Sequence, residues 1–175
     1  TKKVIAVEKD AKMCEILKET LKDFKNLGII QSDILKIPNY QSPISNQTQN
    51  SKIQIQNLYK VVANLPYYIT SPVIRKFLEA ENPPSEMVLM VQKEVAQRIC
   101  ATPPKMSLLA VSVQFYAKPE IISFVSKNSF WPQPKVDSAI IKLKTKSEKR
   151  KIDPKLFFKI VKAGFSQPRK QLINN

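Results

Sequence analysis

Residues 64–67 read Asn-Leu-Pro-Tyr and directly follow the short apolar run 61–63. A buried strand that ends in this way can present a planar amine, because the Asn64 side-chain carbonyl and a nearby backbone carbonyl would accept both hydrogens of an exocyclic amino group. The nitrogen lone pair is then free to meet an electrophile while the ring of Tyr67 stacks on the base. Pro66 fixes one φ angle and removes an N–H, which stiffens the loop. The alternative is an ordinary strand-to-helix turn, since Asn and Pro are common turn residues.

Two acidic residues also stand at the ends of expected strands. Glu8 ends an apolar strand at 4–7, and Asp33 follows a second strand at 27–31. In a doubly wound sheet such acids can bind the ribose hydroxyls and the adenine amino group of a nucleoside cofactor. Each could instead cap the following helix. Their order along the chain with Asn64 favours a cofactor and acceptor site over isolated caps.

The chain alternates between expected strands and expected helices. Strands are expected at 4–7, 27–31, 58–63, 87–91, 120–125 and 138–143, and helices from 10, 71, 92, 107 and 153. This alternation predicts a parallel α/β sheet whose ligands lie at the carboxyl ends of strands. Ser71 and Pro72 predict a helix start, as N-cap and first helical residue. Residues 39–57 are rich in Gln, Asn and Ser and predict a surface insertion.

Charge and composition restrict the partners. The chain holds 29 Lys and Arg against 14 Asp and Glu, for a net charge of +15, and residues 142–175 carry eleven of the cations with two acids. Such a local excess favours nucleic acid as the partner, the alternative being a solvated Lys-rich surface. No apolar run approaches the ~20 residues of a membrane span, so no membrane association is expected. With no His and only Cys14 and Cys100, we expect no zinc or other metal site and a reducing cytoplasm.

The chain resembles the S-adenosylmethionine-dependent rRNA adenine dimethyltransferases of the KsgA (RsmA) type over nearly its whole length. The segments that carry the resemblance are Val4-Ile-Ala-Val-Glu8, Gln31-Ser-Asp33, Val62-Ala-Asn-Leu-Pro-Tyr-Tyr-Ile-Thr-Ser-Pro72, Gln92-Lys-Glu-Val-Ala-Gln-Arg98, Phe130-Trp-Pro-Gln-Pro-Lys-Val-Asp-Ser138 and the ending from Phe165 to Asn175.

The resemblance implies an α/β fold, with a Rossmann-like S-adenosylmethionine-dependent methyltransferase domain over residues 1–150 and the beginning of a small C-terminal helical RNA-binding domain over 151–175. It implies S-adenosylmethionine as cofactor. The implied activity is dimethylation of the exocyclic amines of adjacent adenines in the 3′-terminal hairpin of small-subunit rRNA, as part of ribosome biogenesis. The implied partners are that rRNA and the small ribosomal subunit, met by a cytoplasmic monomer.

Roles for individual residues follow from the same resemblance. The cofactor would be held by Glu8, Asp33, Ile34 and Asn64. The reacting amine would be held by the catalytic segment Asn64, Leu65, Pro66 and Tyr67, and the flipped-out adenine would stack between Tyr67 and Phe130. RNA would be bound by Lys135, Lys149, Arg150, Lys151, Arg169 and Lys170.

The chain departs from the family pattern at several places. The glycine-rich cofactor loop is missing, since Gly28 and Gly164 are the only glycines, so we expect a truncated chain that is inactive alone. Pro168 and Ile173 stand where relatives usually carry Arg, and the segment 101–107 is shorter than usual.

Three other functions remain open. One is an Erm-type methyltransferase of large-subunit rRNA, although Leu65 and the Ser71-Pro72 pair favour the small-subunit type. Another is a ribosome-assembly or RNA-binding factor without catalysis, which the missing glycine loop keeps open. A DNA adenine methyltransferase is less favoured, because it gives no reason for the segment Pro-Lys-Val-Asp-Ser at 134–138.

Overall fold

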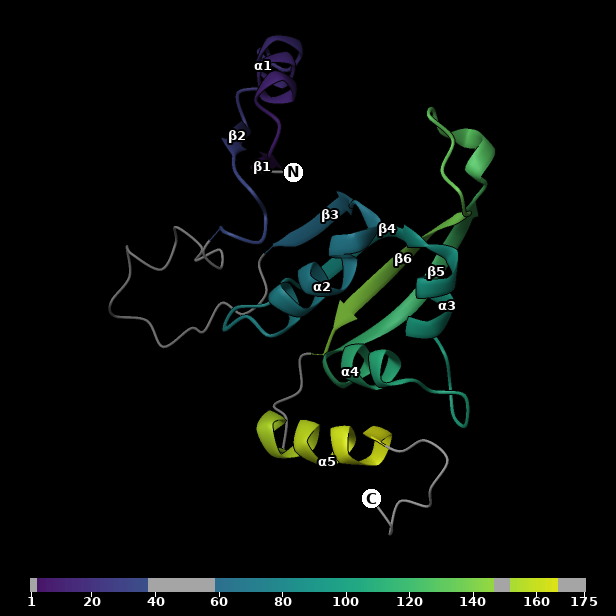
Figure 1. The fold of residues 1–175 in the computed structure, drawn as a ribbon. Coiled ribbons are helices and arrows are strands. Elements are labelled where there is room, and N and C mark those ends of the chain that lie inside the picture. Colours follow the sequence, from purple (N-terminus) through teal and green to yellow (C-terminus); the bar gives the residue numbers. More distant parts are fainter. Residues whose placement is uncertain (1–2, 38–58, 147–151, 167–175) are drawn as a thin grey trace, which may run out of the picture. The chain divides into compact units, whose positions relative to one another are not determined.

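The computed structural model describes residues 3–37, 59–146 and 152–166 (Figure 1). The chain divides into two compact units, Thr1–Ser51 and Lys52–Asn175, and each is described by itself. The surface insertion predicted at 39–57 lies outside the described residues. None of the helices in the described ranges is long and apolar enough to cross a membrane.

The first unit is a β-α-β arrangement. Strand β1 (Val4–Glu8) leads into helix α1 (Ala11–Thr20) and then into β2 (Leu27–Gln31), and the two strands pair in parallel. Asp10 is the N-cap of α1, with its carboxylate accepting from the Met13 N–H at 3.0 Å. The helix ends before the apolar pattern does, because the chain turns after Leu21 and leaves Phe24 60% exposed.

The second unit holds a four-stranded sheet and its helices. In chain order they are β3 (Lys60–Asn64), the 3-10 turn η2 (Tyr67–Ile69), α2 (Thr70–Leu78), β4 (Glu86–Gln92), α3 (Lys93–Ile99), α4 (Leu108–Tyr116), β5 (Ala117–Val125), the 3-10 turn η3 (Lys127–Ser129), β6 (Ser138–Thr145) and α5 (Pro154–Ser166). The strand order is β3-β4-β6-β5.

The sheet is mixed, so the prediction of an all-parallel sheet is wrong for one strand. β3 and β4 are parallel, whereas β6 is antiparallel to both β4 and β5. Residues 126–137, between β5 and β6, contain only the three-residue η3, and a parallel return would need a longer crossover, usually a helix. As a result β6 begins at the edge where β3, β4 and β5 end, with Ser138 opposite both Gln92 and Val125.

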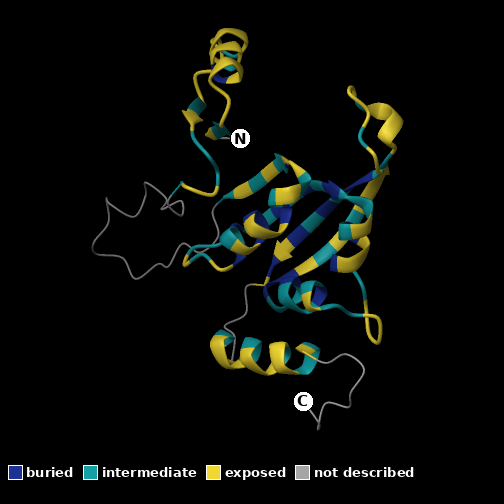
Figure 2. Ribbon diagram, viewed as in Figure 1, coloured by how far each residue is buried: buried dark blue, intermediate teal, exposed yellow. Residues whose placement is uncertain are grey.

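One face of this sheet forms the core. Alternate residues of β4 and β6 are fully buried, and Figure 2 shows these strands as the darkest part of the unit. Helices α2 and α3 each contact α4, and together with the sheet they enclose the core. The buried side chains are Met87, Leu89 and Val91 on β4, Ala139, Ile141 and Leu143 on β6, Val73, Ile74 and Leu78 on α2, Ala96 and Ile99 on α3, and Ala110 and Val113 on α4. The core holds the carboxyl ends of the strands at fixed positions.

Helix α5 packs against α4 through aromatic rings. The rings of Phe115 and Phe157 stack with their centroids 4.2 Å apart, and Phe158 lies edge-on to Phe115 at 5.3 Å. The predicted start of this helix is confirmed, because α5 begins at Pro154 and the Asp153 carboxylate accepts from the Lys155 N–H. A domain boundary near residue 150 stays a prediction.

The predicted N-cap of α2 is wrong. The helix begins at Thr70, its N-cap position is Ile69, and no side chain caps it. The reason is that η2 runs directly into α2, so the turn already exists before Ser71 is reached. Pro72 still lies in the first turn, where its missing N–H breaks no intrahelical bond.

Two serines therefore give a matched test of helix capping. Ser107 is the N-cap of α4 and accepts from the Ala110 N–H at 3.3 Å, whereas Ser71 lies inside α2. Ser107→Ala is expected to lower the free energy of unfolding by about 1 kcal/mol, and Ser71→Ala by less than about 0.5 kcal/mol. Urea denaturation of both variants checks this, and equal losses would contradict the assigned helix starts.

Candidate active site

The segment 64–67 lies at the carboxyl edge of the second unit's sheet. Asn64 is the last residue of β3 and is exposed, whereas the next side chain, Leu65, is buried. Pro66 then starts η2, and its carbonyl accepts from the Ile69 N–H at 3.1 Å. The buried Leu65 anchors the loop, so the Asn64 amide is presented to solvent at the place where ligands of α/β sheets bind.

Tyr67 is held by a residue to which we gave no role from the sequence. Its hydroxyl lies 2.8 Å from the hydroxyl of Ser138, the first residue of β6, and Ser138 is 0% exposed. The alternation of β6 puts Ser138 on the face opposite Ala139 and Ile141, so the sequence pattern does not predict that this serine is buried and needs a hydrogen-bond partner. The contact ties the ring of Tyr67 to the sheet.

Phe130 lies at the end of η3, in the connection between β5 and β6. Its N–H donates to the Lys127 carbonyl at 3.3 Å. The Phe130 ring is half-buried, and the ring next to it, Trp131, is 98% exposed. The exposed ring of this loop is therefore that of Trp131. Stacking by Phe130 stays a prediction.

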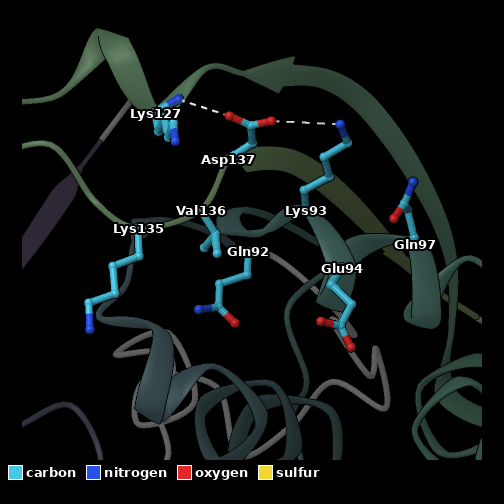
Figure 3. Close-up of a pocket in the computed structure, with 8 residues that line it drawn as sticks. All are labelled: Gln92, Lys93, Glu94, Gln97, Lys127, Lys135, Val136 and Asp137. Atoms are coloured by element: carbon cyan, nitrogen blue, oxygen red, sulfur yellow. Dashed lines mark hydrogen bonds and ion pairs between the residues drawn. The ribbon is translucent and has the colours of Figure 1, made fainter.

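Asp137 links the start of this loop to β4 and α3 (Figure 3). Its carboxylate accepts from the backbone N–H of Lys127 at 3.1 Å and pairs with the Lys93 ammonium at 3.7 Å. The Asp137 carbonyl also accepts from the Lys93 N–H at 3.0 Å. Asp137 therefore connects the loop between β5 and β6, through Lys127, to the start of α3, through Lys93.

An open hollow of about 330 Å³ lies at the same edge of the sheet. It is lined by Gln92, Lys93, Glu94, Gln97, Lys127, Lys135, Val136 and Asp137 (Figure 3). Lys135 is the one predicted RNA-binding residue within the described ranges. The other five, Lys149, Arg150, Lys151, Arg169 and Lys170, lie outside them.

Three of the four predicted cofactor residues, Glu8, Asp33 and Ile34, lie in the first unit, whereas Asn64 belongs to the second. Glu8 ends β1 opposite Gln31 of β2, and its carbonyl accepts from the Ser32 N–H at 2.8 Å. One carboxylate oxygen of Glu8 accepts from the N–H groups of Lys9 and Asp10 at 2.7 and 2.9 Å. Glu8 therefore stands at the strand end as expected, and it also caps the turn.

Asp33 and Glu8 both contact Lys9, Glu8 through the backbone N–H and Asp33 through the ammonium group. The Asp33 carboxylate accepts from the Leu35 N–H at 2.9 Å and pairs with the Lys9 ammonium at 3.5 Å. The hydrogen bond from Leu35, followed by the charge of Lys9, holds the pKa of the Asp33 carboxyl below its usual value. Ile34, another predicted cofactor residue, is the next residue after Asp33. Among the described residues, no group of three or more His, Cys, Asp or Glu could hold a metal ion.

Comparison with known families decides the relationship. A family model described as "Ribosomal RNA adenine dimethylase" matches residues 1–175, the whole chain. The chain belongs to the ribosomal RNA adenine dimethylase family.

Relatives in this family are close in sequence. A protein named "Ribosomal RNA small subunit methyltransferase A" from Dehalococcoides mccartyi (strain ATCC BAA-2266 / KCTC 15142 / 195) is 47% identical over 174 residues, covering 98% of this chain and 56% of that protein. The chain thus spans a little over half the length of this curated relative. The resemblance stated from the sequence is confirmed.

Solved structures confirm the Rossmann-like methyltransferase fold. A dimethyladenosine transferase from Plasmodium falciparum superposes with a TM-score of 0.81 and 29% identity, covering 98% of this chain and 58% of that chain. The 23S rRNA methyltransferase ErmE superposes with a TM-score of 0.77 at 23% identity, covering 97% of this chain and 64% of that chain. At that identity the likeness to ErmE shows the fold alone.

Proposed function

We propose that this ribosomal RNA adenine dimethylase family member transfers methyl groups from S-adenosylmethionine to the exocyclic amines of adjacent adenines in the 3′-terminal hairpin of small-subunit rRNA. The observation that carries the proposal is the exposed Asn64 amide at the end of β3, on a loop anchored by the buried Leu65. Support also comes from relatives over 40% identical that are named small-subunit rRNA methyltransferases.

The residues present in the first unit fit S-adenosylmethionine. The Glu8 carboxylate uses one oxygen for the Lys9 and Asp10 N–H groups, which leaves its second oxygen for ribose hydroxyls. The Leu35 N–H and the Lys9 charge lower the pKa of the Asp33 carboxyl, which favours the acceptor-only carboxylate form that suits the cofactor's adenine amino group. Ile34 and Asn64 complete the proposed cofactor residues. When bound, S-adenosylmethionine supplies a methyl group that is already electrophilic.

The proposed task of the acceptor loop is alignment. The Asn64 side-chain carbonyl and the Leu65 backbone carbonyl accept the two hydrogens of the adenine amine, which directs its lone pair out of the ring plane. Pro66 keeps the two acceptors in register, and Tyr67 stacks on the base. The proton that the amine loses goes to solvent, because Asn64 is exposed.

The target base must leave its stack to reach this loop. Flipping costs a few kcal/mol and is least costly in an unpaired segment, which suits a hairpin loop of rRNA. Stacking between Tyr67 and Phe130 would compensate for part of that cost. The small subunit as partner, the monomeric state, the cytoplasmic location and the lack of a metal stay predictions.

Phe130→Ala is expected to weaken RNA substrate binding by about 1–3 kcal/mol, because one base-stacking surface is lost. Steady-state methylation with varied RNA concentration measures it as a rise in KM. Trp131→Ala serves as the comparison, since that ring is the exposed neighbour. A loss found only in Trp131→Ala would transfer the stacking role to Trp131 and make Phe130 a packing residue.

Neutralising the three adjacent cations Lys149, Arg150 and Lys151 is expected to flatten the salt dependence of RNA binding. Each phosphate contact that is lost lowers the slope of log K against log salt by about 0.7–0.9. Filter binding at several KCl concentrations measures the slope. A control variant neutralises the exposed Lys18, Lys22 and Lys25 of the first unit, which removes the same charge. Equal slopes for both variants would show that the basic run 149–151 is only a solvated surface.

The deciding test of the proposed function is methyl transfer from labelled S-adenosylmethionine by the complete protein as its gene encodes it. Undermethylated small subunits and large-subunit rRNA are offered in parallel. Label in small-subunit adenines is the expected result. Label only in large-subunit rRNA would establish the Erm-type activity instead. RNA binding without any label would indicate an assembly factor.

A further inference from the structure

The two rings proposed to enclose the target adenine come from different parts of the second unit. Tyr67 lies in η2, directly after β3, and Phe130 follows η3, directly after β5. Neither 3-10 turn contains a buried residue. Short turns of this kind do not by themselves hold a ring at a fixed place, so something else must set the distance between the rings.

Both turns are tied to two adjacent residues, Asp137 and Ser138. The Ser138 hydroxyl meets the Tyr67 hydroxyl at 2.8 Å. The Asp137 carboxylate accepts from the Lys127 N–H, the first amide of η3, and the Lys127 carbonyl in turn accepts from the Phe130 N–H. Figure 3 shows Asp137 between Lys127 and Lys93. The dipeptide Asp137-Ser138 therefore contacts Tyr67 directly and contacts the turn before Phe130 through Lys127.

The second residue of this dipeptide begins a central strand of the sheet. Ser138 begins β6, which pairs with β4 on one side and β5 on the other, and its side chain is fully buried. A buried hydroxyl that bonds the phenol holds the hydroxyl end of the ring at one place on the sheet, which stacking alone would leave free. This gives a reason for a tyrosine rather than a phenylalanine at 67.

We propose that Ser138 is a positioning residue for the target base. Its hydroxyl sets the position of the Tyr67 ring, and the Asp137 carboxylate holds the loop that carries Phe130 through the Lys127 N–H. The inference rests on the proposed function, in which the two rings enclose a flipped adenine. Because transfer requires an aligned base, a loosened ring lowers turnover although no group that touches the base is removed.

A double-mutant cycle tests the inference in the complete protein. Ser138→Ala, Tyr67→Phe and the double variant are assayed with the small-subunit substrate. Each single change is expected to lower kcat about tenfold, and the double variant is expected to be no slower than the slower single, because both remove the same contact. Ser138→Thr, which keeps a hydroxyl, is expected to recover most of the rate. Tyr59→Phe is the matched control, since its hydroxyl donates to the Asn82 carbonyl at 2.9 Å outside the proposed site.

A second readout does not depend on activity. With ¹³C-labelled tyrosine, the ring signals of Tyr67 are expected to shift and sharpen in Ser138→Ala, as the ring gains freedom. They are expected to stay unchanged in Ser85→Ala, because the Ser85 hydroxyl donates to the Tyr59 carbonyl at 3.1 Å and does not contact Tyr67. Unchanged Tyr67 signals, wild-type kcat in Ser138→Ala, or losses that multiply in the double variant would each overturn the inference. A wild-type protein that methylates no RNA, while the Tyr67 signals respond to Ser138→Ala, would instead refute the proposed function and leave only a structural contact.

Discussion

Asn64→Ala is expected to reduce kcat for methyl transfer by about 1,000-fold while the dissociation constant for RNA changes less than about twofold. Removing one preorganised hydrogen-bonding group from a reacting centre typically costs a factor of 10²–10³. RNA affinity resides mainly in phosphate contacts made by cations elsewhere, so it should survive. Single-turnover methylation with enzyme in excess, together with filter binding on the same RNA, separates the two effects.

A matched asparagine controls for the loss of an amide. Asn82 lies in the loop before β4, and its backbone carbonyl, which accepts from the Tyr59 hydroxyl, is retained in Asn82→Ala. This variant should turn over like the wild type. If Asn64→Ala keeps full activity, the segment 64–67 is an ordinary turn and the acceptor site must be sought elsewhere on the sheet edge.

The position of Asn64 was predictable because the strand before it and the turn after it are both visible in the sequence. The run 61–63 is apolar, as a short buried strand is, and a Pro two residues after Asn64 ends the strand. The acids Glu8 and Asp33 were placed by the same reasoning, since each follows an apolar strand of the β-α-β unit. In both units the sequence determines which residues reach the carboxyl edge.

The direction of β6 was not predicted, although a signal existed. Buried and less buried residues alternate along β6 in the same way whichever direction the strand runs. The alternation alone therefore does not distinguish parallel from antiparallel pairing. The informative feature was the absence of a helix between 125 and 138, which favours a return in the antiparallel sense. Because β6 is reversed, Ser138 stands at the acceptor edge rather than at the opposite one, and its contact with Tyr67 depends on that reversal.

The prediction of where α2 starts failed for a different reason. Ser followed by Pro is a common helix start, but the segment Tyr67–Ile69 already forms a 3-10 turn. Capping rules assume an extended residue before the helix, and here a turn held by the Tyr67 contact comes first. A tertiary interaction has thus displaced a local signal at the residues proposed to carry function.

Glu8→Ala is expected to raise the dissociation constant for S-adenosylmethionine at least about 100-fold, with kcat at saturating cofactor lowered less than about threefold. A carboxylate that accepts from two ribose hydroxyls makes charge-assisted hydrogen bonds, each of about 1.5–3 kcal/mol. These bonds are remote from the reacting amine and are the same in ground and transition states, so their loss appears in binding rather than turnover. Isothermal titration with S-adenosylmethionine and saturation kinetics measure the two quantities.

The alternative is that Glu8 serves only as a cap, since one of its oxygens already accepts from the Lys9 and Asp10 N–H groups. A pure cap predicts that Glu8→Ala lowers thermal stability and leaves cofactor affinity unchanged. Glu8→Gln distinguishes the two roles further, because its amide oxygen can keep the cap while the charge that ribose hydroxyls prefer is lost. Glu15→Gln, on the exposed side of α1, removes the same charge without either role. Weakened cofactor binding in Glu8→Gln, with the stability and the Glu15→Gln control unchanged, would make Glu8 a cofactor ligand.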